Sequence, residues 1–393
     1  MGNSIHYFWS SINRIGIQII GFVGNVFIAR ILSPDDYGLI AMLSIIIGIS
    51  WNFIDSGFAD YLIRKNDADH KDFGIVLTHN VVVSLVFFGI LYFSAPFIAL
   101  FFERQELILI TRLLGLSVII KAFTITEMTR MRKNLEFKNF AIIQILSSVI
   151  SILLAYFVAI MGYGYFALVV QVISLSVCNL ILLIIINRWL PRFYFDWKQY
   201  KTMRRFGNDM LFSYFTNQIG QNIYSVFIGK FQSSYSLGYF NQALKVNEAS
   251  FQGFNSIILT TSYPIIAKEK NKDLRRKKYE ELSHSFLYIH FFASFLIIGC
   301  ADELILSFFG DKWATSSFFL RLITLSTLFF PLMTINANIV KTESKTNIYR
   351  NLTFIRNGLT LLSLLITFRY SMATILIGLV ISRYISVFLD IVF

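Results

Sequence analysis

Long apolar stretches alternate with short polar ones along almost the whole chain. Segments such as 139–161 and 166–186 stay apolar over about the 20 residues that a helix needs to cross a hydrocarbon core. Segment 81–93 is apolar at odd and even positions alike, whereas strands of a membrane barrel alternate. Because backbone groups in lipid must bond internally, the pattern predicts membrane-spanning helices. We expect twelve, at about 15–33, 37–62, 73–102, 107–128, 139–161, 166–187, 210–232, 238–264, 284–308, 313–336, 351–368 and 372–393.

The lysines and arginines of the polar stretches are distributed unevenly. Counted from the N-terminal tail, one alternating set of loops holds 24 of them and the other set holds five. Basic loops remain on the cytoplasmic side of a membrane, so the split predicts that both termini are cytoplasmic. The loops are short, and we therefore expect the function to reside within the bilayer.

A weak internal repeat relates the two halves of the chain. With a shift of 200 residues, 18–38 and 218–238 share seven identical residues in 21 positions without a gap. Either two apolar helices match by coincidence, or two six-span lobes repeat about an axis along the membrane normal, as in some transporters. We expect the second, because the matches include a serine and a glycine. An all-α integral membrane protein with two lobes is predicted, with the boundaries 1–187, 188–209 and 210–393.

The predicted linker 188–209 mixes basic residues with Trp189, Phe193, Trp197 and Tyr200. This composition suits an amphipathic helix in the cytoplasmic interface of the membrane. The alternative is a solvated basic loop.

Composition supports a membrane protein and excludes several other classes. Hydrophobic residues make up 55% of the 393 residues, and charged residues make up 15%. Soluble domains have about 45–50% apolar and about 25% charged residues. The net charge of +12 fits basic loops beside anionic lipid, and no nucleic-acid partner is expected. Cys178 and Cys300 lie in apolar runs and predict no disulfide. The five histidines lack metal-ligand spacing, and we expect no cofactor.

Polar side chains recur at helical spacing inside several spans, although a charge at membrane depth costs a few kcal/mol. Such stripes on four spans predict a water-filled cavity between the halves. The alternatives are that single amides hold helices together and that Lys245 pairs with Glu248. We expect Arg112, Glu127, Arg356 and Asp390, near span ends, to snorkel towards water. The candidate substrate-binding residues are Arg14, Gln18, Asn25, Asp55, Lys121, Gln218, Gln221, Lys245, Glu248, Gln252 and Asn255.

Five segments resemble one family of transport proteins. They are FIARILSPDDYGLIAM (27–42), FIDSGFADYLIRK (53–65), LGYFNQALKV (237–246), YPIIAKEKNKD (263–273) and FFGDKW (308–313). They are similar to bacterial polysaccharide transporters of the multidrug/oligosaccharidyl-lipid/polysaccharide (MOP) exporter superfamily, closest to the Wzx-type flippases of O-antigen and capsule assembly. The resemblance implies two six-helix lobes in a V around a central cavity, as in MATE transporters. Family members commonly have fourteen spans, so we expect either a shorter member or a truncated one.

The resemblance also implies the substrate, an oligosaccharide on an undecaprenyl pyrophosphate carrier that is moved to the outer leaflet of the bacterial inner membrane. Bases suit the pyrophosphate, and amides and hydroxyls suit the glycan. We expect Arg14 to capture the headgroup, Lys245 to help carry it, and Asp55 or Glu248 to couple transport to a proton or sodium ion. Expected partners are this substrate, membrane lipids, and the polysaccharide polymerase with its chain-length machinery.

Three other functions remain open on the residues alone. A drug or organic-cation antiporter of the same superfamily should have a cavity dominated by carboxylates, whereas the charges inside these spans lean basic. A membrane enzyme acting on lipid-linked sugars needs catalytic residues on a sizeable loop, and we expect no enzyme because none is available. A structural scaffold would not need charges inside its spans.

Overall fold

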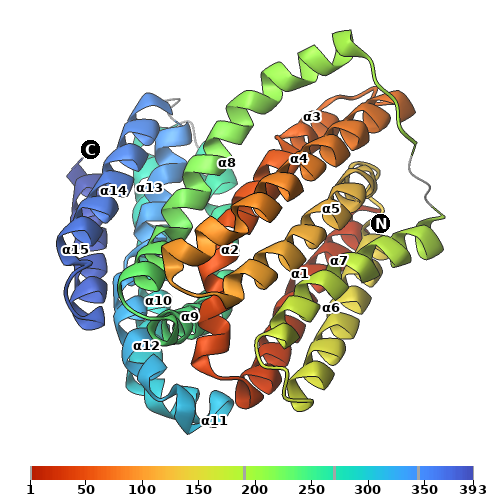
Figure 1. Ribbon diagram of the computed structural model, residues 1–393. Coiled ribbons are helices and arrows are strands. Elements are labelled where there is room, and N and C mark those ends of the chain that lie inside the picture. The colour runs from red at the N-terminus through yellow and green to blue at the C-terminus, as the bar shows by residue number, and fades with distance from the viewer. Residues whose placement is uncertain (1, 189–191, 269–270, 343–345, 393) are drawn as a thin grey trace. The chain divides into compact units, whose positions relative to one another are not determined.

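The computed structural model describes residues 2–188, 192–268, 271–342 and 346–392, and every regular element in these ranges is helical (Figure 1). The elements are α1 (Gly2–Ile31), α2 (Pro34–Asp55), α3 (Phe58–Arg64), α4 (His70–Phe102), α5 (Glu106–Lys133), α6 (Phe137–Ile160), α7 (Phe166–Asn187), α8 (Trp197–Phe231), α9 (Ser234–Lys268), α10 (Lys272–Gly299), α11 (Ala301–Phe309), the short 3₁₀ turn η1 (Asp311–Trp313), α12 (Thr315–Ser326), α13 (Phe330–Thr342), α14 (Thr346–Thr367) and α15 (Met372–Val392).

All twelve predicted spans fall on helices, and the chain is a multi-pass membrane protein. Within the described ranges, nine helical segments are long and apolar enough to cross a membrane. Three of the predicted spans are broken. In span 284–308, α10 ends at Gly299 and α11 begins at Ala301. Breaks also divide spans 37–62 and 313–336. In the first, α2 ends at Asp55, and Ser56 and Gly57 adopt the left-handed conformation, with φ of 49° and 71°, before α3 begins. In the second, α12 ends at Ser326 and α13 begins at Phe330.

Capping residues explain where two of the long helices begin. The backbone N–H of Asp36 donates to Oγ of Ser33 at 3.3 Å, and the N–H of Ser33 donates to the Asp36 carboxylate at 2.8 Å. Asp69 and Asp72 make the same reciprocal pair at the start of α4. Each capping box satisfies backbone donors that the first helical turn leaves unbonded, so α2 and α4 begin before their apolar stretches.

The chain divides into two compact units, Met1–Lys230 and Phe231–Phe393. The first unit therefore contains α8 up to Lys230, although the repeat assigns this helix to the second half. α8 begins at Trp197, inside the predicted linker, and continues without a break to Phe231. The second part of the expected interfacial linker thus forms the first turns of a long helix, and the lobe boundaries themselves stay a prediction.

The first unit is a bundle in which α1 packs on α6, α6 on α7, and α4 on α5 (Figure 1). Small residues allow the close approach of α1 and α6, as is common between helices in membranes. A Cβ atom on Gly24 would lie 2.6 Å from side-chain atoms of Ile152. A larger residue at this position would push the two helices apart.

Alternate loops lie at opposite ends of this bundle. At one end, Nζ of Lys133, at the end of α5, donates to the carbonyl oxygen of Leu62 near the end of α3, at 2.9 Å. At the other end, the guanidinium of Arg104 binds both carboxylate oxygens of Asp35 at 2.8 and 2.7 Å. The structure therefore gathers loops of the basic set at one end, as the alternating charge pattern predicts.

The second unit pairs α9 with α12 and α13, and α14 with α15. At one end, Nε2 of Gln232 donates to the carbonyl oxygens of Phe368 and Tyr370 at 3.2 and 2.8 Å. Towards the other end, the guanidinium of Arg356 binds the carboxylate of Asp390 at 2.8 Å. This unit therefore also holds its helices together by polar contacts at both ends.

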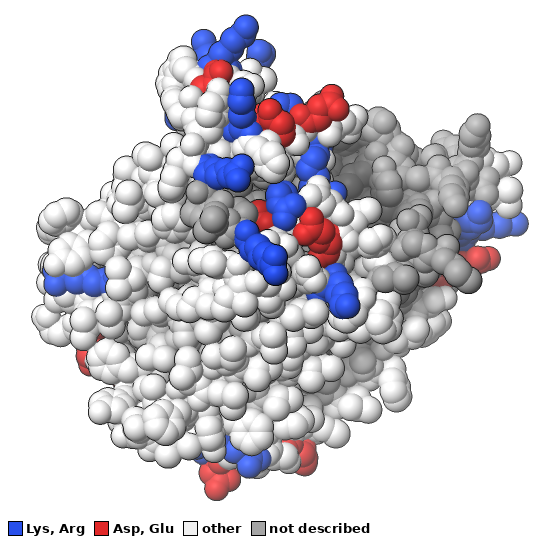
Figure 2. Space-filling model, turned by 90° about the vertical axis from the view of Figure 1, so that its right-hand side faces the viewer, with Lys and Arg blue, Asp and Glu red and all other residues white. Residues whose placement is uncertain are grey.

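One side of the molecule has the surface expected of a protein in lipid. Figure 2 shows charged side chains from the top to the middle of this face, a few at its left and right edges and a small group at the lower edge, with a wide uncharged area across its lower half. On α6 and α7, Leu153, Ile160 and Ile185 are 61%, 59% and 65% exposed. Exposed apolar area of this extent indicates contact with lipid tails.

Candidate functional site

Two acidic side chains lie at the break between α2 and α3, Asp55 at the end of α2 and Asp60 in the first turn of α3. The carboxylate of Asp55 accepts the backbone N–H of Ala59 at 3.1 Å and so caps α3. Asp60, in the first turn of α3, accepts a hydrogen bond from the Tyr214 hydroxyl on α8. The break thus gives Asp55 a structural role and connects α3 to α8.

Lys121 approaches the same place from α5. Its Nζ atom lies 3.4 Å from the ring centroid of Trp51 on α2, and its charge is within electrostatic range of Asp55. A cation over an indole ring is stabilised by about 2 kcal/mol when both are removed from water. The structure thus brings together Asp55 and Lys121, which the sequence predicted on separate spans, and adds Trp51, which it did not single out.

The remaining side of the site comes from α8. Nδ2 of Asn52 donates to Oε1 of Gln218 at 3.5 Å, so Gln218, a third predicted residue, contacts α2 at the residue that follows Trp51. Gly48 makes room for it, because a Cβ atom there would lie 1.9 Å from Nε2 of Gln218. We call Trp51, Asn52, Asp55, Lys121 and Gln218 the Lys121 cluster. It offers a cation, a carboxylate and two amides inside a membrane-spanning bundle, which is suitable for an anionic, hydroxyl-rich ligand.

The predicted residues of α1 lie on another helix pair. Arg14 is exposed, whereas Gln18 and Asn25 are half-buried on the helix that packs against α6. The backbone carbonyl of Asn25 accepts a hydrogen bond from the Tyr37 hydroxyl at 3.5 Å. Their role in binding stays a prediction.

The predicted residues of the second unit lie on α9. Lys245 and Glu248, three residues apart, are both exposed and within electrostatic range of each other. The side chains of Gln221 on α8 and of Gln252 and Asn255 on α9 lie outside the described part of the structure. Their predicted contribution to a cavity is therefore untested.

The expectation that charges near span ends snorkel towards water is wrong for three residues. Glu127 is 2% exposed and binds the Arg130 guanidinium at 2.6 Å. The side chain of Asp390 is 1% exposed, and its partner Arg356 19%. Each carboxylate binds a neighbouring guanidinium, and this pairing offsets much of the cost of burying its charge. The pair of Arg356 and Asp390 joins two helices, which hydropathy does not report, whereas Glu127 and Arg130 lie three residues apart on α5, a spacing that the sequence shows.

Metal chemistry has no visible site in the ranges that the structure describes. No group of three or more histidine, cysteine, aspartate or glutamate side chains there could hold a metal ion.

Comparison with known proteins identifies relatives over most of the chain. A family model described as "Polysaccharide biosynthesis protein" matches residues 27–318. The chain is 24% identical to the teichuronic acid biosynthesis protein TuaB of Bacillus subtilis (strain 168) over 354 residues, 86% of this chain and 71% of TuaB. It is 22% identical to the lipopolysaccharide biosynthesis protein WzxC of Escherichia coli (strain K12) over 314 residues, 78% of this chain and 63% of WzxC. The chain thus spans less than two thirds of WzxC.

Solved structures share the fold at low sequence identity. The lipid II flippase MurJ, in an inward closed conformation, superposes with a TM-score of 0.77 at 15% identity, covering 97% of this chain and 86% of MurJ. An inward-facing multidrug resistance MATE family transporter of the MOP superfamily gives 0.67 at 13% identity, covering 95% of this chain and 93% of that one. The predicted MOP-like fold class is confirmed. Because the family model matches well over half of its length, this chain belongs to the polysaccharide biosynthesis protein family, and the two relatives described above are named as biosynthesis proteins of teichuronic acid and of lipopolysaccharide.

Proposed function

We propose that this protein is a flippase that moves an undecaprenyl-pyrophosphate-linked oligosaccharide across the bacterial inner membrane for surface polysaccharide assembly. Family membership and the names of TuaB and WzxC support the class of substrate. The fold shared with a lipid II flippase supports the class of movement. The observation that carries the proposal is the Lys121 cluster, a cation with amides at membrane depth on such a fold.

In this proposal the cluster holds the polar part of the substrate. The Lys121 ammonium donates charge-assisted hydrogen bonds to the pyrophosphate, and the amides of Asn52 and Gln218 bind glycan hydroxyls. Arg14 captures the headgroup first, Lys245 receives it on the second unit, and Asp55 couples the movement to a proton or a sodium ion. The flipped product passes to the polymerase and chain-length machinery.

The cluster is tested by Lys121→Met in a cell that depends on this protein for its surface polysaccharide. Loss of one charge-assisted hydrogen bond should lower export roughly ten- to a hundredfold, while lipid-linked precursor accumulates in the inner leaflet. The matched control is Arg112→Met, because Arg112 is also a basic residue of α5 placed over an aromatic ring, 4.3 Å from the centroid of Tyr92. Normal export by Lys121→Met, or an equal loss in both variants at normal protein levels, would exclude a specific role for Lys121.

The predicted capture step has its own test. Arg14→Ala and Lys245→Ala should each reduce surface polysaccharide at unchanged protein level. Arg14→Lys should restore export in part, since a point charge remains but the bidentate fork is lost. Undiminished export by both alanine variants would remove Arg14 and Lys245 from the path.

The proposed orientation is tested by labelling in intact cells. In a variant with Cys178 and Cys300 replaced by serine, single cysteines are introduced as Lys198→Cys and Tyr163→Cys, both at exposed positions. A membrane-impermeant maleimide should label position 163 only, because the basic segment 188–209, which contains Lys198 at the start of α8, is cytoplasmic in this proposal. Labelling at position 198 from outside would reverse the topology.

A further inference from the structure

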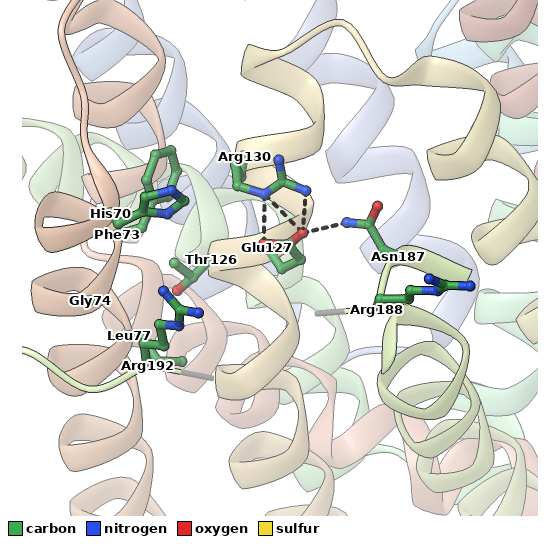
Figure 3. A pocket seen from close by; sticks show the side chains of 10 residues that line it. All are labelled: His70, Phe73, Gly74, Leu77, Thr126, Glu127, Arg130, Asn187, Arg188 and Arg192. Atoms are coloured by element: carbon green, nitrogen blue, oxygen red, sulfur yellow. Dashed lines mark hydrogen bonds and ion pairs between the residues drawn. The ribbon is translucent and has the colours of Figure 1, made fainter. Parts of the chain in front are cut away.

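A pocket of about 330 Å³ lies apart from the Lys121 cluster, at the end of the first unit that carries the basic loops. Figure 3 shows it between the beginning of α4, the end of α5 and the end of α7. Its charged lining comprises Glu127, Arg130, Arg188 and Arg192, with His70 at the start of α4. The pocket volume is within the range that holds small ligands or headgroups.

The one acidic residue among these lining residues is already satisfied. Nε of Arg130 binds both carboxylate oxygens of Glu127 at 2.9 Å, and Nη2 binds one of them at 2.6 Å. The Asn187 amide donates to the same carboxylate (Figure 3). The negative charge of Glu127 is therefore already paired with Arg130, and Arg188 and Arg192 add two further positive charges to the pocket. An anion is the ligand that such a lining favours.

The backbone of the segment before α8 is fixed against α4, and this places Arg192. Gly74 leaves room for the segment, because a Cβ atom there would lie 2.8 Å from Cβ of Tyr194 and 3.0 Å from the carbonyl oxygen of Arg192. Oγ1 of Thr78 donates to the carbonyl oxygen of Tyr194 at 3.0 Å. In Figure 3 the Arg192 side chain extends between α4 and α5. The pocket is thus built in advance of any ligand, which reduces the entropic cost of binding.

The surroundings of the pocket match the boundary between membrane and water. Next to it, Phe193, Phe195 and Trp197 are 56%, 51% and 66% exposed, and aromatic side chains are enriched at this depth. In the last two turns of α7, Ile181 and Ile185 are 47% and 65% exposed. A lipid whose phosphate lies in the pocket could place its acyl chains against the exposed side chains of Ile181 and Ile185 on α7, whereas a soluble phosphate has no acyl chains to contact them.

We propose that this pocket binds the phosphate headgroup of an anionic glycerophospholipid, with Arg188 and Arg192 as the recognising side chains and the acyl chains along α7. Basic pockets between transmembrane helices on the cytoplasmic side are suited to anionic headgroups. The bound lipid would hold the end of α7 and the start of α8 against α4. The proposal is independent of what the protein transports.

The experiment titrates the purified full-length protein with phosphatidylglycerol and counts bound lipid by native mass spectrometry. The test variant is Arg188→Gln with Arg192→Gln. The matched control is Lys201→Gln with Arg205→Gln, which removes the same charge from exposed positions on α8 outside the pocket. We expect one phosphatidylglycerol in the wild type, with binding weakened on the order of tenfold or more in the test variant and unchanged in the control. Phosphatidylcholine should bind weakly to all three.

A second variant guards against misfolding. Arg188→Lys with Arg192→Lys keeps both charges, and it should bind phosphatidylglycerol with intermediate affinity. Unchanged binding by the glutamine variant, or equal loss in the control, would overturn the proposed site. Displacement of phosphatidylglycerol by equimolar inorganic phosphate would assign the pocket to a soluble anion instead. Preferential displacement by undecaprenyl pyrophosphate would assign it to the transported substrate, and either result would overturn the phospholipid assignment.

Discussion

Gly207 on α8 offers a sharp test of how the Lys121 cluster is held together. At this residue α8 crosses the break between α2 and α3, and a Cβ atom would lie 2.4 Å from the carbonyl oxygen of Ser56 and 2.8 Å from the ring of Phe58. The nearest atom belongs to backbone, so Gly207→Ala forces α8 away from α2 by at least about 0.6 Å before the contact becomes tolerable. The hydrogen bond between Asn52 and Gln218, already 3.5 Å long, cannot survive that displacement.

The magnitude follows from two opposing terms. Overpacking costs about 1–3 kcal/mol, while alanine in place of glycine gains about 0.8–1.0 kcal/mol of helix propensity. Because backbone cannot rotate aside, we expect the upper part of the first range and a net destabilisation of about 2 kcal/mol. Thermal unfolding of the purified protein in detergent should show a Tm lower by a few degrees. Surface polysaccharide should fall as well, because Gln218 leaves the cluster.

The control for this substitution is Gly89→Ala. No atom lies within 4 Å of a Cβ atom built on Gly89, which is on α4. This variant should be as stable as the wild type, or more stable by up to about 1 kcal/mol. A Gly207→Ala protein that unfolds at or above the wild-type temperature would refute the close packing of α8 on the break.

Two ion pairs lead to further predictions. Lys230 is hydrogen-bonded to Glu103 at 2.7 Å and lowers the pKa of that carboxyl below its ordinary range. The pair therefore stabilises the fold at pH values above the ordinary glutamate pKa, and this stabilisation is lost as the pH falls through the lowered pKa. The Tm difference between wild type and Lys230→Gln should therefore be present at neutral pH and vanish in acid; a difference that persists there would contradict the pairing. Asp390→Asn leaves Arg356 without its buried partner and should destabilise the protein by about 3–5 kcal/mol, whereas Arg356→Met with Asp390→Leu should be nearly neutral, as measured by Tm.

Hydropathy predicted the helices because lipid leaves the backbone no other structure over these lengths. The starts of α2 and α4 could also be anticipated, since serine or aspartate precedes an aspartate at capping-box spacing. The break at Ser56 and Gly57 was not, because apolar residues continue on both sides and conceal it. A serine–glycine pair directly after Asp55 was the available signal. The hydropathy pattern therefore predicts the presence of a helix more reliably than the position of a break within it.

The candidate site was predictable only in part. The argument that selected Asp55, Lys121 and Gln218 is that charges and amides are costly in lipid. It applies wherever in the chain the partners of these residues lie. Trp51 could not be selected, because an aromatic residue in an apolar run has the same appearance as a core residue. Glu127 was misjudged although its ion-pair partner Arg130 lies only three residues away on α5. Its second partner, Asn187, lies 60 positions away in the chain, and only the packing of α5 on α7 brings it to Glu127.

The position of the Asp55 carboxylate has a consequence for how ion binding could affect the contacts between helices of the first unit. It is at once a neighbour of the Lys121 charge and the acceptor for the first turn of α3. A proton or cation on the Asp55 carboxylate reduces its negative charge and so weakens it as an acceptor for the Ala59 N–H, which would link ion occupancy thermodynamically to the stability of that helical turn. The hydrogen bond from Tyr214 to Asp60 extends the link from α3 to α8. In the proposed function, an ion bound at this single carboxylate would therefore act as a transducer that changes how firmly α3 and α8 are joined.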